Sequence, residues 1–121
     1  MDLVKPRVAG FGLRAGAGLA SLRAALDLAA CGPLSVIATI PERADTLRPL
    51  AQELGLPLRI VRVQGVVTPT QSTRVQARFG TGSVAEAAAL VAAGRGAVVV
   101  VKRVASADGM ATCAVAEGDG T

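Results

Sequence analysis

The stretch Arg7-Val-Ala-Gly-Phe-Gly-Leu-Arg-Ala-Gly-Ala-Gly18 is an apolar run that breaks into glycines around a single arginine. Residues 5–13 read as a buried strand, and residues 18–30 carry apolar side chains at helical spacing. A glycine-rich connection between a strand and a helix lets the backbone approach a ligand and points free N–H groups at it. We therefore expect one wall of a binding site here, with Arg14 as a candidate partner for an anion.

Strands and helices alternate along most of the remaining chain. Further strands are predicted at residues 34–40, 58–63, 97–104 and 110–116, and further helices at residues 41–54, 71–78 and 84–93. Pro49 lies inside the second helix, which therefore either kinks there or begins later, near Asp45. Ala107-Asp108-Gly109 is a hairpin signal, so the last strand should return antiparallel beside the strand before it. The β-branched residues 97–104 predict a central buried strand, and the tail 117–121 is expected to fray.

This alternation predicts an α/β fold, a three-layer α/β/α sandwich around a mostly parallel sheet of about five strands with the last strand antiparallel. A chain of 121 residues fits a single domain spanning residues 1–121. Parallel strands gather their carboxyl ends at one edge of a sheet, where open α/β sheets bind ligands. Four segments should meet at that edge: residues 10–18, 39–43, 64–82 and 102–103.

The composition excludes several classes of function. The chain contains no histidine, which rules out imidazole acid–base catalysis and imidazole metal ligands, so we expect neither a metal nor a cofactor. It has no Trp or Tyr and two Phe, and therefore lacks the stacking platforms with which proteins bind single-stranded nucleic acid. The net charge of +4 fits either solubility or attraction for an acidic small molecule.

The sequence also bears on location and on the cysteines. No apolar run reaches the roughly 18 residues of a membrane span, and no signal peptide precedes Lys5, so we expect a cytoplasmic protein without a membrane partner. Cys31 and Cys113 have no paired spacing and are expected to be small buried hydrophobic residues.

Two motifs have more than one interpretation. Ser83-Val-Ala-Glu86 has the spacing of a capping box, in which the serine accepts from the N3 amide and the glutamate reaches back to the N–H of the cap. Glu86 is accordingly a candidate either for this capping role or for a general acid or base. Gly10-x-Gly12-x-x-Ala15 matches the alanine form of the dinucleotide fingerprint, which leaves a nucleotide-binding regulatory domain as an alternative.

Several polar side chains are candidates for binding ligand oxygens. The hydroxyls are those of Thr39, Ser72, Thr81 and Ser83, and none has a neighbouring base that would make it nucleophilic. Lys102 and Arg103 follow each other at the end of a predicted strand. One of the two must therefore point to each face of the sheet, and we select Lys102 for the site.

The segments Gly10-Phe-Gly-Leu-Arg-Ala-Gly16, Ala38-Thr39-Ile40 and Gly80-x-x-Ser83-Val-Ala-Glu-Ala-Ala88, together with Ser72 and the strand containing Lys102, resemble the CobE/CbiG C-terminal domain family of cobalamin biosynthesis. The resemblance implies a protein that binds a carboxylate-rich precorrin or corrinoid intermediate, as a carrier or as an accessory to another cobalamin-pathway enzyme. The family also includes domains fused to an enzyme that opens a precorrin δ-lactone with loss of a two-carbon fragment, so a hydrolase is an alternative.

Whether the chain is itself an enzyme is left open. Glu86 is the candidate catalytic group. The candidate substrate-binding residues are Gly10, Gly12, Arg14, Gly16, Thr39, Ser72, Thr81, Ser83 and Lys102.

Overall fold

Strand β1 (Arg7–Leu13) lies at the centre of a five-stranded sheet in the computed structural model, which describes residues 6–29 and 32–120. The other strands are β2 (Val36–Thr39), β3 (Leu58–Ile60), β4 (Val98–Ala105) and β5 (Ala111–Glu117). The helices are α1 (Leu19–Leu28), α2 (Ala44–Leu54), α3 (Thr73–Phe79) and α4 (Val84–Ala93), and the 3-10 turn η1 (Pro41–Arg43) precedes α2.

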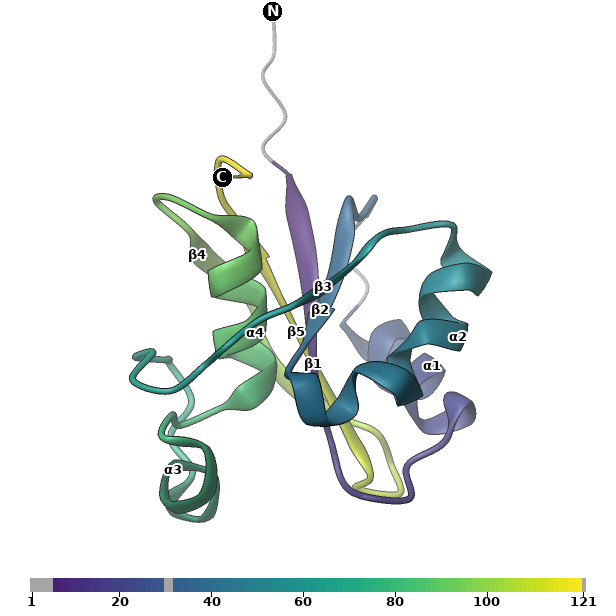
Figure 1. Cartoon of the computed structure of the whole chain (residues 1–121), viewed down its shortest axis with the longest axis horizontal. Helices are drawn as coiled ribbons and strands as arrows, with labels where there is room; N and C mark the ends of the chain where they lie inside the picture. The colour runs from purple at the N-terminus through teal and green to yellow at the C-terminus, as the bar shows by residue number, and fades with distance from the viewer. Residues whose placement is uncertain (1–5, 30–31, 121) are drawn as a thin grey trace, which may run out of the picture.

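The strands follow the order β3-β2-β1-β5-β4. β1, β2 and β3 pair in parallel, while β5 is antiparallel to both β1 and β4. Helices α1 and α2 lie on one face of the sheet and α4 lies on the other, with α3 at the lower edge (Figure 1). The three-layer α/β/α fold with an antiparallel last strand is therefore confirmed.

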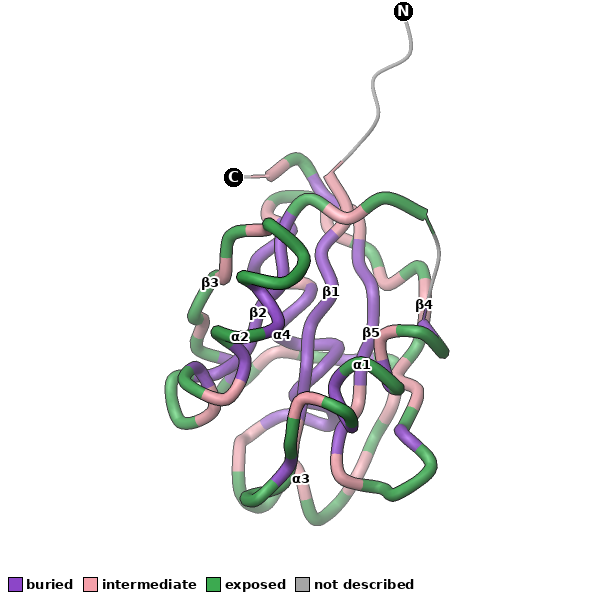
Figure 2. Tube along the Cα trace, turned by 90° about the vertical axis from the view of Figure 1, so that its right-hand side faces the viewer, coloured by how far each residue is buried: buried purple, intermediate pink, exposed green. Residues whose placement is uncertain are grey.

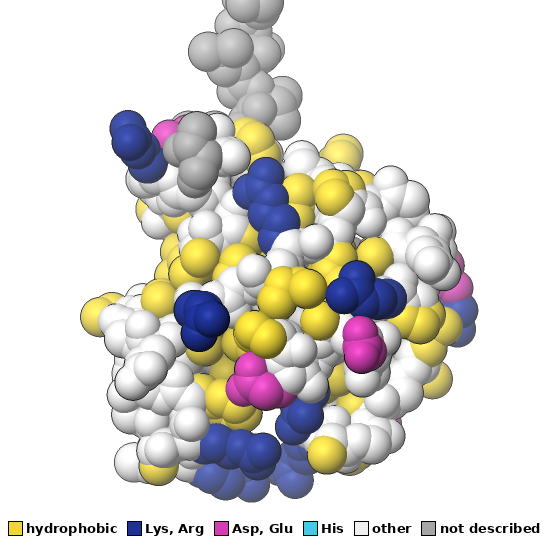
Figure 3. All heavy atoms as spheres, viewed as in Figure 1, with side chains coloured by type: hydrophobic (Ala, Val, Ile, Leu, Met, Phe, Trp, Pro, Cys, Tyr) yellow, Lys and Arg dark blue, Asp and Glu magenta, His cyan; other side chains and the backbone are white. Residues whose placement is uncertain are grey.

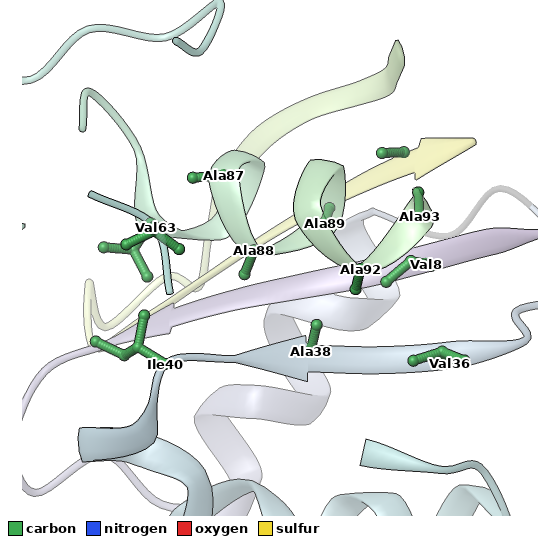
Figure 4. Packing of buried hydrophobic residues seen from close by; sticks show 12 residues of the cluster. Val8, Val36, Ala38, Ile40, Val63, Ala87, Ala88, Ala89, Ala92 and Ala93 are labelled. Atoms are coloured by element: carbon green, nitrogen blue, oxygen red, sulfur yellow. The ribbon is translucent and has the colours of Figure 1, made fainter. Parts of the chain in front are cut away.

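The two faces of the sheet are packed differently. Towards α1 and α2 the core contains large side chains, among them Phe11, Leu22 and Leu47. Towards α4 it contains mostly alanines, and Figure 4 shows Ala88 and Ala92 directed at the sheet beside Ala38. The strands at the centre of the molecule are buried along their length (Figure 2).

Gly10 explains how α4 comes so close to β1. A Cβ atom built on Gly10 would lie 2.1 Å from the Ala85 carbonyl oxygen and 2.5 Å from the Ala89 amide nitrogen. Only glycine fits between a strand and a helix backbone at this separation. Gly10 and Gly12 lie inside β1, which ends at Leu13 as predicted, so only residues 14–18 of the expected glycine segment 10–18 lie outside the strand.

Several sequence expectations are corrected by the structure. The valine-rich strand β4 is at the edge of the sheet, with Val98 55% and Val100 38% exposed, because β5 takes the place between β1 and β4. Residues 118–120 do not fray, since Gly118 donates to the Pro6 carbonyl at 3.3 Å and Gly120 donates to the Ala93 carbonyl at 2.8 Å. β3 is limited to Leu58–Ile60, shorter than the predicted 58–63.

Other expectations are confirmed. α2 begins at Ala44 after the 3-10 turn, which is the later start that Pro49 suggested. Cys113 is buried in β5, whereas Cys31 lies outside the described residues. Among residues 6–29 and 32–120, no helix has both the length and the apolar character needed to cross a membrane.

Candidate functional site

A cavity of about 620 Å³ lies at the carboxyl edge of the parallel strands. All four segments that were expected to converge there contribute to its walls: the end of β1 and the turn after it, the residues after β2, helix α3, and the end of β4. The lining residues are Gly12, Leu13, Arg14, Ala15, Ile40, Arg43, Arg74, Val75, Arg78, Phe79, Val84, Arg103, Ala105, Gly109, Met110 and Thr112. The volume is in the range of small-molecule binding sites.

The charged residues around this cavity are all arginines. They are Arg14, Arg43, Arg74, Arg78 and Arg103, and in the described part of the chain no Asp or Glu lines the cavity. None of the five is in an ion pair with a carboxylate of the part of the chain that the structure describes, although Arg7, Arg23 and Arg48 elsewhere are. Lys and Arg side chains accordingly gather at the lower edge of the molecule in Figure 3. We call these five residues the arginine cluster.

The remaining walls of the cavity are largely apolar. Leu13 ends β1, Ile40 follows β2 and Val84 begins α4. Phe79 and Met110 contribute from α3 and from the β4–β5 turn. Cations around an apolar surface suit a ligand with an apolar body and anionic groups at its periphery, since the body is desolvated while each anion is paired.

Helix α3 supplies two members of the arginine cluster. Ser72 caps the helix by accepting from the Val75 amide at 3.4 Å, and none of the seven helical residues is fully buried. Arg74 and Arg78 are four residues apart and therefore lie on the same side of the helix. The Arg78 guanidinium carbon lies 5.2 Å from the centroid of the Phe79 ring, which is within cation–π distance.

Glu86 fixes two walls of the cavity from behind. Its side chain is fully buried, and its carboxylate accepts from the Thr70 amide at 2.8 Å, the Thr70 hydroxyl at 2.6 Å and the Arg103 amide at 2.8 Å. Glu86 does not line the cavity itself. It connects α4 to Thr70, in the segment before α3, and to the backbone of Arg103 in β4.

The predicted capping box is half confirmed. Ser83 accepts from the Glu86 amide at 3.2 Å, as expected of the cap. The glutamate, however, binds Thr70 and the Arg103 amide rather than reaching back to the N–H of Ser83. The tertiary structure brings in competing donors from residues 16 and 17 positions away, which local sequence spacing does not reveal.

The predicted site residues are placed in different surroundings. Gly12 and Arg14 line the cavity, and Gly16 lies in the turn before α1 with φ of +88°. The other hydroxyls are used inside the protein: Thr39 donates to the Phe11 carbonyl at 2.9 Å, and Thr81 donates to the Val66 carbonyl at 2.6 Å. Ser72 and Ser83 cap helices.

Of the successive residues Lys102 and Arg103, the structure places Arg103 at the cavity. Lys102 is exposed outside it. Register shifts between β4 and β5 occur between Val99 and Val101 and again between Val101 and Val104. Because a bulge reverses which residues face each side, the alternation of a regular strand could not locate Lys102.

Three further arginines were absent from the predicted set. Arg43 follows β2 and donates its Nε to the Leu13 carbonyl at 3.0 Å, which ties the ends of β1 and β2 together. Arg74 and Arg78 lie in the polar segment 64–82. The available signal was their spacing of four residues within a predicted helix at the expected binding edge.

The dinucleotide fingerprint lacks the geometry that its chemistry needs. In that motif the glycines form the turn that opens the helix beneath a pyrophosphate. Here Gly10 and Gly12 lie inside β1, and α1 begins only at Leu19. Gly10 permits the approach of α4, so the match reflects helix packing and carries no argument for a nucleotide.

The turn between β4 and β5 closes one side of the site. Asp108 accepts from the Ser106 hydroxyl at 2.6 Å, from the Ser21 hydroxyl at 2.5 Å and from the Met110 amide at 3.0 Å. These hydrogen bonds, that of Ser106 first, lower the pKa of Asp108 from 3.8 to about 2. The neighbouring Gly109 and Met110 are thereby held at the cavity wall.

Within residues 6–29 and 32–120, no three side chains of His, Cys, Asp or Glu lie close enough together to hold a metal ion.

Comparison with known families gives a match over residues 7–116 to the family described as Cobalamin synthesis G C-terminus. The chain belongs to this family of cobalamin biosynthesis proteins. The match includes all four helices and all five strands, apart from Glu117, the last residue of β5. A comparison with curated protein sequences gives no match.

Solved structures of cobalamin biosynthesis proteins have a similar fold. CobE, a protein from the cobalamin (vitamin B12) biosynthetic pathway, is 27% identical, with a TM-score of 0.77 over 97% of this chain and 93% of that chain. The cobalamin biosynthesis protein chiG from Agrobacterium tumefaciens is 34% identical, with a TM-score of 0.64 over 93% of this chain and 98% of that chain.

A third structure shows the fold alone. It is a putative cobalamin biosynthesis protein G homolog from Sulfolobus solfataricus, 22% identical, with a TM-score of 0.69. The similarity covers 93% of this chain and 37% of the Sulfolobus chain.

Proposed function

We propose that this protein binds a carboxylate-rich precorrin or corrinoid intermediate in the cavity at the carboxyl edge of its sheet, as a carrier or as an accessory to another cobalamin-pathway enzyme. The observation that carries the proposal is the arginine cluster: five arginines, and no carboxylate of the described residues, surround a largely apolar cavity. Family membership supports the pathway, and the cationic, largely apolar cavity supports a ligand of this chemistry.

Electrostatic repulsion among the five arginines supports the proposal. Five cations around one cavity repel one another, and none is neutralised by a described carboxylate. A polycarboxylate relieves that repulsion and forms charge-assisted hydrogen bonds, each worth about 1.5–3 kcal/mol when formed away from water. The apolar part of the cavity accommodates the face of a macrocycle, whose burial contributes about 25 cal/mol per Å².

A binding role fits this cavity better than lactone hydrolysis. Hydrolysis needs a group that activates water; among the residues that the structure describes no Asp or Glu lines the cavity, and the sequence contains no His. The carboxylate of Glu86 accepts three hydrogen bonds from within the protein. No observation in the cavity favours the hydrolase alternative.

Porphyrins with different numbers of carboxylates test the proposal. The protein should bind octacarboxylic uroporphyrin more tightly than tetracarboxylic coproporphyrin, and that more tightly than dicarboxylic mesoporphyrin, with affinities that fall as salt is added. With no Trp or Tyr in the chain, porphyrin absorbance and fluorescence report binding without interference from the protein. Equal affinity for all three porphyrins would contradict recognition by the arginine cluster.

Turnover separates a carrier from an enzyme. A purified precorrin intermediate mixed with the protein should show a spectral change complete on binding, followed by no further change. Slow conversion to a ring-opened product would instead favour the hydrolase.

A further inference from the structure

A second cavity, of about 450 Å³, adjoins the first. Ile40, Arg78 and Phe79 line both cavities, so the same three side chains form a shared wall. The other lining residues follow β2 and β3: Pro41, Glu42, Val61, Arg62, Val63 and Gln64. The second cavity therefore continues the first along the same carboxyl edge of the sheet, from the side of β1 and β5 towards β3.

The wall between the cavities consists of three side chains that lie at the end of a helix or just after a strand. Arg78 and Phe79 are the last two residues of α3, a helix in which no residue is fully buried. Ile40 is the residue after β2. The three residues shared by the two cavities therefore lie outside the strands of the sheet, at the end of α3 and after β2.

The second cavity differs from the first in charge. Arg62 and the shared Arg78 supply two cations, and Glu42 supplies one carboxylate. None of these three side chains takes part in an ion pair within the described ranges. The second cavity thus attracts anions less strongly than the arginine cluster does, and Glu42 opposes the attraction.

We propose that the second cavity is a subsite for one peripheral carboxylate of a ligand too large for the first cavity, with Arg62 as the residue that binds it. The inference rests on the proposed function, because the ligand is the same polycarboxylic macrocycle. The body of the ligand lies on Ile40 and Phe79, and its peripheral groups reach the arginine cluster on one side and Arg62 on the other. The carboxylate of Glu42 repels a second anion, so the second cavity accepts one carboxylate of the ligand.

Two probes of different size and three variants test the subsite. Uroporphyrin is large enough to extend into both cavities, and benzene-1,3,5-tricarboxylate is small enough to remain in the first. Arg62→Ala should weaken uroporphyrin binding about three- to fivefold, as expected for an exposed ion pair, and leave the tricarboxylate unchanged. Glu42→Gln should strengthen uroporphyrin binding by a similar factor. Arg95→Ala is the matched control, because Arg95 precedes β4, at the opposite end of that strand from Ala105 in the first cavity.

The outcomes separate this inference from the proposed function. Loss of uroporphyrin affinity in Arg62→Ala alone, by fluorescence titration, supports the subsite. Equal behaviour of Arg62→Ala and Arg95→Ala overturns it, while tight binding by the wild-type protein still supports the proposed function. An equal loss for the tricarboxylate in Arg62→Ala also overturns it, since the effect is then one of net charge. Absence of uroporphyrin binding by the wild-type protein contradicts both proposals.

Discussion

Gly10→Ala is the substitution that best separates a packing role from a ligand-binding role at the start of the chain. The new Cβ would stand 2.1 Å from the Ala85 carbonyl oxygen, whereas real Cβ contacts essentially never fall below 3.0 Å. The obstacle is helix backbone, which cannot rotate away as a side chain can. Helix α4 must therefore move off β1.

The cost follows from what α4 buries. The face of α4 towards the sheet consists of small residues, among them Ala88, Ala89 and Ala92, which keep their contacts only at close approach. Opening a gap of 0.5–1 Å forfeits about a quarter to a half of each dispersion contact, and overpacking of a core typically costs about 1–3 kcal/mol. We expect a loss of about 3 kcal/mol, because many contacts open together, and a melting temperature lower by roughly 10–15 °C.

Thermal unfolding followed by far-UV circular dichroism measures this loss. Gly18→Ala is the control, since a Cβ on Gly18 would meet nothing within 4 Å. The control should cost less than about 1 kcal/mol, because Gly18 caps α1 without a side-chain hydrogen bond that the substitution could remove. A Gly10→Ala protein as stable as Gly18→Ala, but impaired in porphyrin binding, would refute the packing argument and restore Gly10 to the ligand site.

Two further substitutions address the anchors of the cavity. In Glu86→Gln, the amide N–H₂ must face either the Thr70 amide or the Arg103 amide, so one buried donor loses its acceptor. The free energy of unfolding, measured in urea, should fall by about 2–3 kcal/mol. An unchanged urea midpoint would contradict a structural role for the Glu86 carboxylate. Asp108 has a pKa lowered from 3.8 to about 2 in the folded protein, so its stabilising contribution is fully present above the unfolded value and is lost as the pH falls towards 2. Asp108→Asn should therefore be less stable than wild type at pH 6, with the difference closing by pH 2; a difference independent of pH would contradict the assignment.

The fold could be predicted from the sequence wherever the pattern is local. Alternating strands and helices, the helix over residues 84–93 and the hairpin at Asp108 are all expressed in neighbouring residues and are confirmed. The order of the last two strands is not local. Apolar content placed residues 97–104 at the centre, although their charged pair Lys102-Arg103 contrasts with Ala111–Glu117, which has no charged residue before its last position. That contrast was the available signal.

The sequence predicts the position of the cavity in the fold better than it predicts the residues that line the cavity. Four segments meet at the carboxyl edge because parallel strands dictate it, and Arg14 lines the resulting cavity. The chemistry of a hydroxyl predicts that Thr39 and Thr81 can bind ligand oxygens, but the tertiary structure supplies each with an internal carbonyl acceptor, which the sequence does not reveal. The sequence analysis predicts Lys102 at the site, whereas Arg103 lines the cavity. The irregular register of β4 that produces this difference is not visible in the sequence.

The central claim, that the arginine cluster recognises the carboxylates of a tetrapyrrole, is tested most directly by the dissociation constant for uroporphyrin of the double variant Arg14→Gln/Arg103→Gln. The double variant Arg48→Gln/Arg95→Gln removes the same charge from outside the cavity. We expect at least about a thirtyfold loss of affinity for the first variant, for two charge-assisted hydrogen bonds, and less than about threefold for the second. Equal affinities in the two double variants would contradict the claim.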